Sequence, residues 1–293
     1  MNPSSLAAQP RAAQRPTLVR RLGVPALLAV AAAVPLAARA QATNTASAIA
    51  TATQEAPSRW SFSWGWNRET YSTSDIHFWG QDHDFTLYDV HAHDKQSPTK
   101  HIFRTYLNPG KITIPQTNAR LAYQWSEDEA LALNLDHMKY VMTTNQTVPI
   151  SGQIYGVEQS GTQVLSPDFM SYEHTDGLNV LTLEYEKQWM VHPFGASAPV
   201  RLFGLGGGGI VVPKSNVTLA VMGQKRNDRF HLAGGSVHMA VGAEMDFFTD
   251  YFARLTGKTG YVDLPDVVTS ARKDHASQHF TYTEYMLTFG YRF

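Results

Sequence analysis

The chain has 293 residues, with 24 lysines and arginines, 25 aspartates and glutamates, a formal net charge of −1 and no cysteine. The length is enough for one large β domain, and the absence of cysteine excludes a disulfide framework. Beyond the amino-terminal region there is no apolar run of about 18 residues, which excludes a conventional helical membrane protein. A β-barrel stays open, because its strands are marked by alternation that hydropathy averages hide.

The amino-terminal 40 residues have the pattern of a secretory signal peptide. Four arginines between positions 11 and 21 precede the apolar stretch VPALLAVAAAVPLA, and the small residues ARA end at Ala40. We therefore expect a signal peptide over 1–40 with cleavage after Ala40, and a retained signal anchor is the alternative. Cleavage would remove five arginines and no acidic residue, leaving 19 basic residues against 25 acidic ones. Such an acidic chain argues against a nucleic-acid partner, which would need a basic face.

Residues 41–58 are small and polar, which predicts a disordered linker before a single domain at 59–293. The strand signal begins at once with WSFSWGWNR at 60–68. Its four aromatic residues alternate with serine, glycine and asparagine, and alternate side chains of a strand point to opposite faces. This pattern indicates a strand with one apolar, aromatic face and one face of small or polar residues.

The same alternation recurs to the end of the chain. The stretches concerned are NARLAYQW, ALALNLDHMKYV, YEHTDGLNVLTLEYEKQW, VRLFGLGGGGIVV, HLAGGSVHMAVGAEMDFF, YFARLTGKTGYV and EYMLTFGYRF. The glycine-rich stretch at 200–212 is expected where the wall bends or packs closely. The aromatic residues cluster at strand ends, as in the interfacial girdles of membrane proteins, whereas a sandwich core would favour branched aliphatic residues.

The connections between these stretches alternate in length. Short ones fall at 126–129, 190–199 and 249–250, and long ones at 142–170, 213–230 and 262–279, as periplasmic turns and external loops do. We expect an all-β protein, a transmembrane antiparallel up-and-down β-barrel. The stretch 72–117 decides the strand count. Two strands within it, DFTLYDVHAH and HIFRTYLN, would give ten, which we favour, and one elaborate external segment would give eight.

The last residues point to the same class. Tyr285, Phe289, Tyr291 and Phe293 alternate with smaller or polar residues up to the terminal position. This ending resembles the carboxy-terminal signature of bacterial outer-membrane β-barrels. The resemblance implies an outer-membrane location, recognition of these residues by the barrel assembly machinery, and contact with outer-membrane lipid and lipopolysaccharide. We expect a monomer.

A second resemblance covers residues 67–179. The segments GWNRETYSTSDIHFWG, DFTLYDVHAHD, NPGKITIPQTN, LDHMKYVM and EHTDGLN are similar to a group of uncharacterised bacterial outer-membrane proteins. That resemblance implies no activity.

Polar residues on the inward face predict a lumen filled by hydrogen bonds and salt bridges, as in narrow barrels. The members that we single out for this network are Asn67, Asn118, Arg120, Asn134 and Glu184. Arg120 is expected to pair with carboxylates on neighbouring strands, with Asp136 and Glu184 as candidates. The lumen would then be largely plugged.

A catalytic alternative centres on YEHTDGLN. Certain outer-membrane lipid hydrolases carry a histidine near a serine at the barrel wall, and His174 could act as the base, oriented by Asp176 or Asp136. By count, His174 and Asp176 share the inward face. No serine stands beside His174, so a nucleophile would have to come from another strand. The candidates are Ser72, Ser74, Ser171 and Ser236.

The sequence DVHAHD offers a second chemical possibility. Asp89, His91 and His93 are expected on one strand face, where two imidazoles and a carboxylate could bind zinc or another divalent metal. A polar network or a pH-responsive patch is the alternative. No cofactor is expected otherwise. The leading functional hypothesis is a structural or small-solute barrel without catalysis, and the lipid acyl hydrolase is the alternative.

Overall fold

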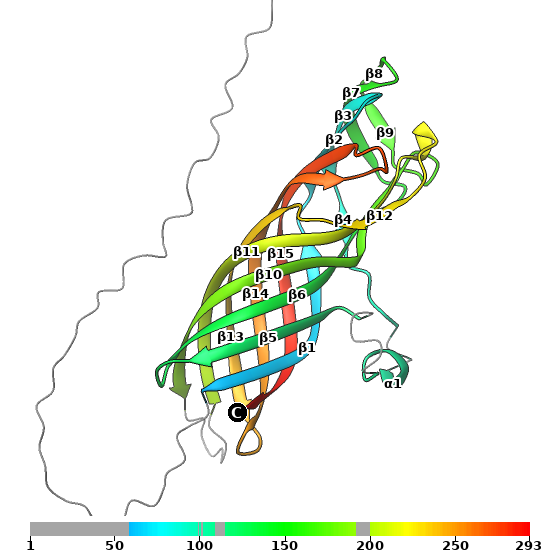
Figure 1. Ribbon diagram of the computed structural model, residues 1–293. Coiled ribbons are helices and arrows are strands. Elements are labelled where there is room, and N and C mark those ends of the chain that lie inside the picture. Colours follow the sequence, from blue (N-terminus) through cyan, green and yellow to red (C-terminus); the bar gives the residue numbers. More distant parts are fainter. Residues whose placement is uncertain (1–58, 99, 101, 109–114, 192–199) are drawn as a thin grey trace, which may run out of the picture. The chain divides into compact units, whose positions relative to one another are not determined.

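The computed structural model describes residues 59–98, 100, 102–108, 115–191 and 200–293, and most of these residues lie in β-strands (Figure 1). The expected signal peptide at 1–40 and linker at 41–58 lie outside the described residues. No helix in the described ranges is long and apolar enough to cross a membrane.

Eight strands form a closed antiparallel ring. Each of the eight pairs with the next ring strand along the chain, and the last pairs with the first, so the topology is up-and-down. The strands are β1 (Trp60–Tyr71), β5 (Thr117–Gln124), β6 (Glu129–Met142), β10 (Ser171–Val191), β11 (Val200–Thr218), β13 (Gly234–Asp246), β14 (Tyr251–Val268) and β15 (His275–Arg292). At the seam, the main chains of Trp60 and Phe293 exchange two hydrogen bonds, with N–O distances of 3.2 and 2.9 Å. The expected barrel fold is confirmed.

The remaining elements build an extension beyond the ring. They are β2 (Ser74–Trp79), β3 (His83–Val90), β4 (Ala92–His93), β7 (Thr147–Ile154), β8 (Val157–Gln159), β9 (Thr162–Val164) and β12 (Asn227–Phe230), with the short helices α1 (Ile102–Thr105) and η3 (Ala220–Met222). Strand β2 pairs with the first residues of β15, and β3 pairs with β7 (Figure 1).

The ring therefore has eight strands, the alternative count, instead of the favoured ten. The reason is the pairing of β1, which has β15 on one side and β5 on the other. No place in the wall is left for two strands from 72–117. These strands continue the sheet from β15 beyond the ring, so the alternation in that segment serves the extension.

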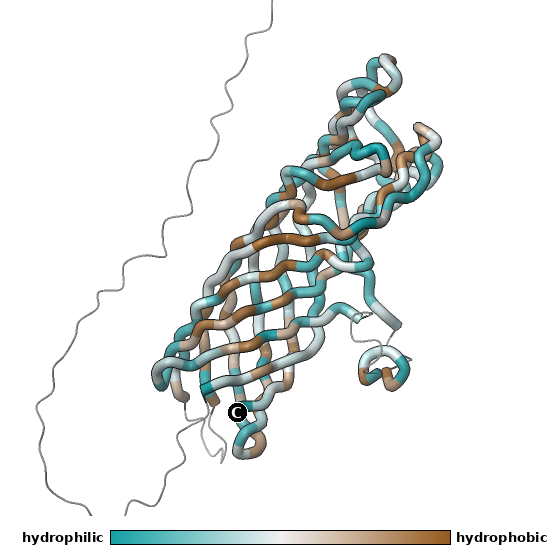
Figure 2. The backbone as a smooth tube through the Cα atoms, in the orientation of Figure 1, coloured by the Kyte–Doolittle hydropathy of each residue, from teal (hydrophilic) through white to brown (hydrophobic). Residues whose placement is uncertain are grey.

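The outside of the ring carries an apolar belt. Brown, apolar positions recur along its strands in Figure 2. The exposed members include Phe62, Leu121, Leu133, Leu183, Ile210, Val237, Met239, Val241, Leu255, Tyr285, Leu287 and Phe289. Aromatic rings contact one another near the short turns, as in the pairs Trp60–Tyr123, Trp125–Tyr185 and Tyr251–Tyr291. An apolar outer band edged by aromatic rings is what a bilayer requires of a spanning barrel.

Along β10, β14 and β15, the inward side chains change from polar to apolar partway along the strand. On β14, Arg254 and Lys258 point inward below the level of this change, whereas Val262 and Leu264 are buried above it. The outward side chains change in the opposite sense, from Leu255 to polar residues. Above this level, the inward side chains form one apolar cluster, which we call the upper core. It includes Phe78, Phe85, Leu87, Met138, Tyr140, Tyr172, Leu178, Val180, Val262, Leu264, Phe280 and Tyr282.

The glycine-rich strand β11 packs closely against its neighbour, as expected. A Cβ atom on Gly209 would stand 2.0 Å from the main-chain oxygen of Leu181, and one on Gly207 would stand 2.7 Å from that of Leu183. Only glycine fits at such a distance.

We predict that Phe293→Asp, or deletion of Phe293, strongly reduces the amount of folded protein in the membrane. The change places a charge on the lipid face at the seam and removes the last residue of the expected assembly signal. The measurement is the heat-modifiable fraction on gels of purified membranes. Phe230→Asp is the matched control, because Phe230 on β12 is similarly exposed, at 59% against 54% for Phe293, but lies in the extension. Normal levels of the Phe293 variants would contradict the prediction.

Candidate functional site

The most concentrated chemistry of the molecule lies inside the ring. Eight charged side chains from six strands are buried there, and we call them the lumen cluster. They are Arg120, Asp136, Glu184, Glu186, Glu244, Arg254, Lys258 and Glu284. They fall inward because the outward positions of the same strands face the apolar belt. A buried charge requires a partner, so the pairs that follow are a condition of this fold.

Arg254 is the centre of the lower part of the lumen cluster. Its guanidinium group donates to both oxygens of Glu186, at 3.2 and 2.6 Å, and to Glu244 Oε2 at 2.9 Å. Its guanidinium carbon also lies 3.7 Å from the centre of the Phe203 ring, in cation–π geometry. Glu244 is shared further with Arg201 and Arg292 toward the short-turn end.

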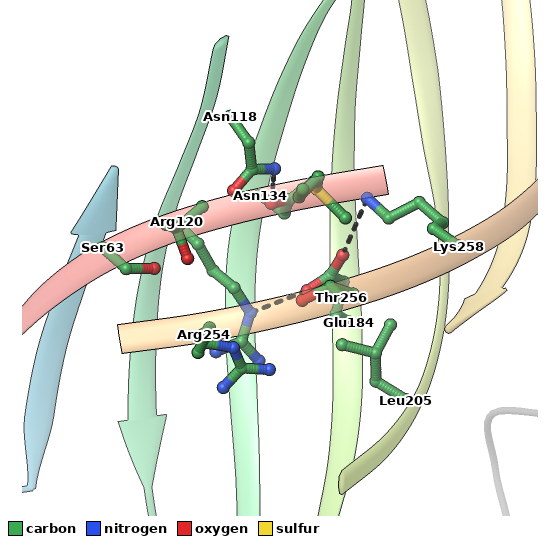
Figure 3. Close-up of a pocket in the computed structure, with 11 residues that line it drawn as sticks. Ser63, Asn118, Arg120, Asn134, Glu184, Leu205, Arg254, Thr256 and Lys258 are labelled. Atoms are coloured by element: carbon green, nitrogen blue, oxygen red, sulfur yellow. Dashed lines mark hydrogen bonds and ion pairs between the residues drawn. The ribbon is translucent and has the colours of Figure 1, made fainter. Parts of the chain in front are cut away.

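Glu184 connects the lower part to the upper part. Arg120 Nε donates to Glu184 Oε2 at 2.8 Å (Figure 3). Arg120 Nη2 lies 2.9 Å from Glu186 Oε2. The other oxygen of Glu184 lies 3.0 Å from His238 Nε2 and 3.6 Å from Lys258 Nζ. A single carboxylate thus links three positively charged or imidazole side chains.

Lys258 organises the upper part. Its Nζ donates to Asp136 Oδ2 at 2.7 Å and lies 3.6 Å from Glu284 Oε2. Asn118 Nδ2 donates to Asp136 and to Asn134, at 2.5 and 2.7 Å. Asn67 Nδ2 donates to Glu284 Oε1 at 2.7 Å. All five residues singled out from the sequence for the lumen are therefore buried inside the ring, within this set of bonds.

The pairing expected for Arg120 is only half realised. Glu184 is a partner, but the second partner is Glu186, and Asp136 pairs with Lys258 instead. The selected set also omitted Glu186, Glu244, Arg254, Lys258 and Glu284. The alternation of apolar and polar residues places all five on the inward face of their strands. The sequence therefore contained the signal for these residues, but the selection concentrated on the first strands.

Very little space remains between these side chains. The cavity that they line measures about 10 Å³, which is at the lower limit for one water molecule (Figure 3). Its lining includes Ser63, Asn134, Thr256 and Met286 besides the charged residues. The lumen cluster holds a network of paired charges and leaves no room for a substrate.

His174, the expected catalytic base, is fully buried in the upper core. Its ring lies 4.9 Å from the Tyr172 ring and 5.8 Å from the Tyr140 ring. Its Nδ1 has no hydrogen-bond partner, and its Nε2 lies 3.5 Å from Gln278 Nε2. No hydroxyl group in the described part of the chain is within hydrogen-bond reach of the imidazole.

Neither expected orienting acid contacts His174. Asp176 pairs with Lys214 at 3.1 Å on the outside, and Asp136 pairs with Lys258. The expectation that His174 and Asp176 share a face fails because the register of β10 shifts between 174 and 178. Such a bulge re-aims the side chains that follow it. The structure gives the lipid hydrolase hypothesis no support.

The expected metal ligands Asp89, His91 and His93 do not share one strand face. Asp89 has a φ of 54°, which interrupts the alternation, β3 ends before His91, and His93 belongs to β4. The Nδ1 atom of His93 lies 3.1 Å from Thr143 Oγ1. Among the described residues, no group of three or more histidine, aspartate or glutamate side chains is placed to hold a metal ion.

A second hollow, of about 480 Å³, lies in the extension where the β2–β3 turn meets the β7–β8 turn. Its acids are already paired, Asp82 with Arg272 at 3.0 Å and Asp84 with His77 at 2.8 Å. His83 also lines it, and burial lowers the pKa of this imidazole. The acids of this hollow thus already have partners within the protein.

A closed antiparallel ring with an apolar outside and paired charges inside is the architecture of bacterial outer-membrane proteins. The described residues fold as an up-and-down antiparallel β-barrel of the kind that spans membranes.

Solved structures of the same class are similar to this chain. Ail, the attachment invasion locus protein of Yersinia pestis, is 11% identical with a TM-score of 0.32, over 81% of this chain and 99% of its own. AlkL is 11% identical with a TM-score of 0.34, over 85% and 97%. OprG from Pseudomonas aeruginosa is 9% identical with a TM-score of 0.37, over 81% and 97%. No protein-family model matches the chain, and no curated protein matches it significantly. At such identities and TM-scores, these similarities assign no activity.

We predict that Arg120→Ala lowers the free energy of unfolding by about 3–5 kcal/mol, because Glu184 and Glu186 each lose a cation in a buried site. Urea unfolding in lipid vesicles, followed by tryptophan fluorescence, measures the loss. Lys187→Ala is the control, since its pairs with Asp128 and Glu129 are partly exposed and worth about 0–1 kcal/mol. Equal effects of the two substitutions would mean that the lumen is solvated.

Proposed function

We propose that this protein is a non-conducting outer-membrane barrel with a structural role, which is to hold the β-extension beyond the membrane. The observation that carries the proposal is the closure of the interior at two successive levels. The lumen cluster fills the ring within the apolar belt, and the upper core fills it above.

The two closures differ in kind. Within the belt, an ion would have to displace paired charges such as Arg254–Glu186 and Lys258–Asp136, and each of these buried groups would then lose an ion-pair partner. Above the belt, it would have to cross packed aromatic rings, among them Tyr140 against Phe280 at 4.9 Å between ring centres. Removing one barrier would leave the other, so the interior is poorly suited to solute passage.

The extension is a continuation of the wall. Strands β10, β11, β14 and β15 have 21, 19, 18 and 18 residues. A spanning strand needs about 10 residues, which leaves about 8 residues, or roughly 25 Å of strand, outside the hydrocarbon. The upper core ties β2, β3 and β7 to these projecting ends. The barrel thus serves as a rigid base for a folded structure outside the membrane.

A small-solute role is the alternative, and the feature that could serve it is a hollow on the lipid-facing wall. This hollow measures about 610 Å³, and its apolar surface includes Trp189, Gly206, Met239 and Tyr285. The inward side chains of Leu205, Ala240 and Lys258 also line it, and all three are buried. These buried side chains close the inner end of the hollow, and lipid chains are its natural filling.

We predict that the purified protein gives no single-channel conductance in planar bilayers and no swelling of vesicles in sugar solutions. The double variant Arg254→Ala/Glu186→Ala should also be silent, because the upper core still closes the interior. An open porin measured in parallel shows that the assay detects channels, and heat-modifiable migration shows that the protein is folded. Steady conductance steps from the wild-type protein would rule out the structural role and favour the small-solute role.

A further inference from the structure

The segment around α1 exposes apolar side chains that no part of the described protein covers. Phe103 is 79% exposed, and Ile102 and Leu107 are 48% and 49% exposed. None of the residues of α1 is buried. A short segment with three large exposed apolar side chains is costly in water and marks an interaction surface.

The segment is nevertheless fixed to the barrel. Tyr106, next to α1, is buried, and its hydroxyl accepts a hydrogen bond from Arg68 Nη2 at 2.9 Å and donates to the main-chain oxygen of Ser97 at 2.5 Å. The Tyr106 ring meets the Trp66 ring edge to face, with centroids 6.1 Å apart. These contacts hold α1 outside the wall beside β1 (Figure 1).

The point of attachment is the upper border of the apolar belt. Along β1, the outward side chains are aromatic as far as Trp66, and the next outward residue is Arg68. Tyr106 contacts both of these residues, so it bridges the last apolar position and the first charged one. The exposed side chains of α1 therefore lie where hydrocarbon gives way to headgroups.

We propose that Ile102, Phe103 and Leu107 insert into the interfacial layer of the lipid leaflet on the extension side and anchor the barrel at a fixed depth. The occupant of this surface is lipid because the surface is continuous with the belt through Trp66 and Tyr106. Charge supports the same partner, since the exposed cations Lys100 and Arg104 stand on this segment and complement lipid phosphates. Aromatic and aliphatic side chains beside cations are typical of segments that lie in the interface.

The test uses single cysteines, which the cysteine-free chain allows without other changes. Phe103→Cys, Leu255→Cys and Val157→Cys are each labelled with an environment-sensitive fluorophore and reconstituted into phospholipid vesicles. Leu255 faces lipid within the belt and is 63% exposed, and Val157 on β8 of the extension is 62% exposed, so they are the lipid and water references. Quenching by spin-labelled phospholipids reports the depth of each label.

We expect the label at 103 to emit at shorter wavelength than the label at 157. Shallow spin labels should quench the label at 103 at least twofold more strongly than the label at 157. Deep spin labels should quench the label at 255 more than the label at 103. A label at 103 that behaves like the one at 157 would overturn the proposal. Emission at short wavelength without quenching by any lipid label would also overturn it, because a protein surface or a second copy would then cover the segment.

Discussion

Glu184 and Glu186 stand two residues apart on β10 with both side chains inside a narrow ring, and neither can be buried there as an anion without a cation. Arg120 on β5, Arg254 and Lys258 on β14, and His238 on β13 supply the partners. These residues lie across the lumen or around the wall from β10. The pairs therefore act as cross-links between strands that share no main-chain hydrogen bond, and they hold the ring to one register.

The same requirement accounts for the filled interior of the ring among the described residues. A ring of eight strands is just wide enough for its inward side chains to fill it. The side chains of the lumen cluster are long and charged. Their paired arrangement leaves a cavity of only about 10 Å³ between them. Because the pairs are interlocked, with Glu184 bonded to Arg120 and His238 and close to Lys258, one substitution takes a partner away from several buried groups. Stability and closure are thus two results of one network.

Alternation was sufficient to predict the barrel, the lipid face and the inward position of residues such as Asn118 and Arg120. It could not predict partners, because the pairing across the lumen depends on strand stagger, which brought Lys258 to Asp136 and left Glu186 for Arg120. It also gave ten strands in place of eight, because DFTLYDVHAH and HIFRTYLN were both counted as ring strands. The first forms β3 and β4 of the extension, and the second contains the helix α1. The expectation that His174 and Asp176 share a face was wrong for a local reason. A bulge follows His174 on β10, and alternation in the sequence does not reveal it.

The reversal of polarity along a strand marks the membrane border in the sequence. In the belt the outside faces lipid and the polar residues must go inward, whereas beyond it the outside faces water and the inside becomes an ordinary core. On β15 the inward residues change from Thr288 and Glu284 to Tyr282 and Phe280, and on β10 from Glu186 and Glu184 to Val180 and Leu178.

Register joins the changes on neighbouring strands into one level. Lys258 stands opposite Glu284 on the polar side of the change, and Val262 stands opposite Phe280 on the apolar side. The inversion of amphipathicity is therefore shared by these two neighbouring strands at one height. Since β2, β3 and β7 bury their apolar residues against the strand ends above that height, the extension folds on the barrel as a water-exposed domain with the upper core as its interior.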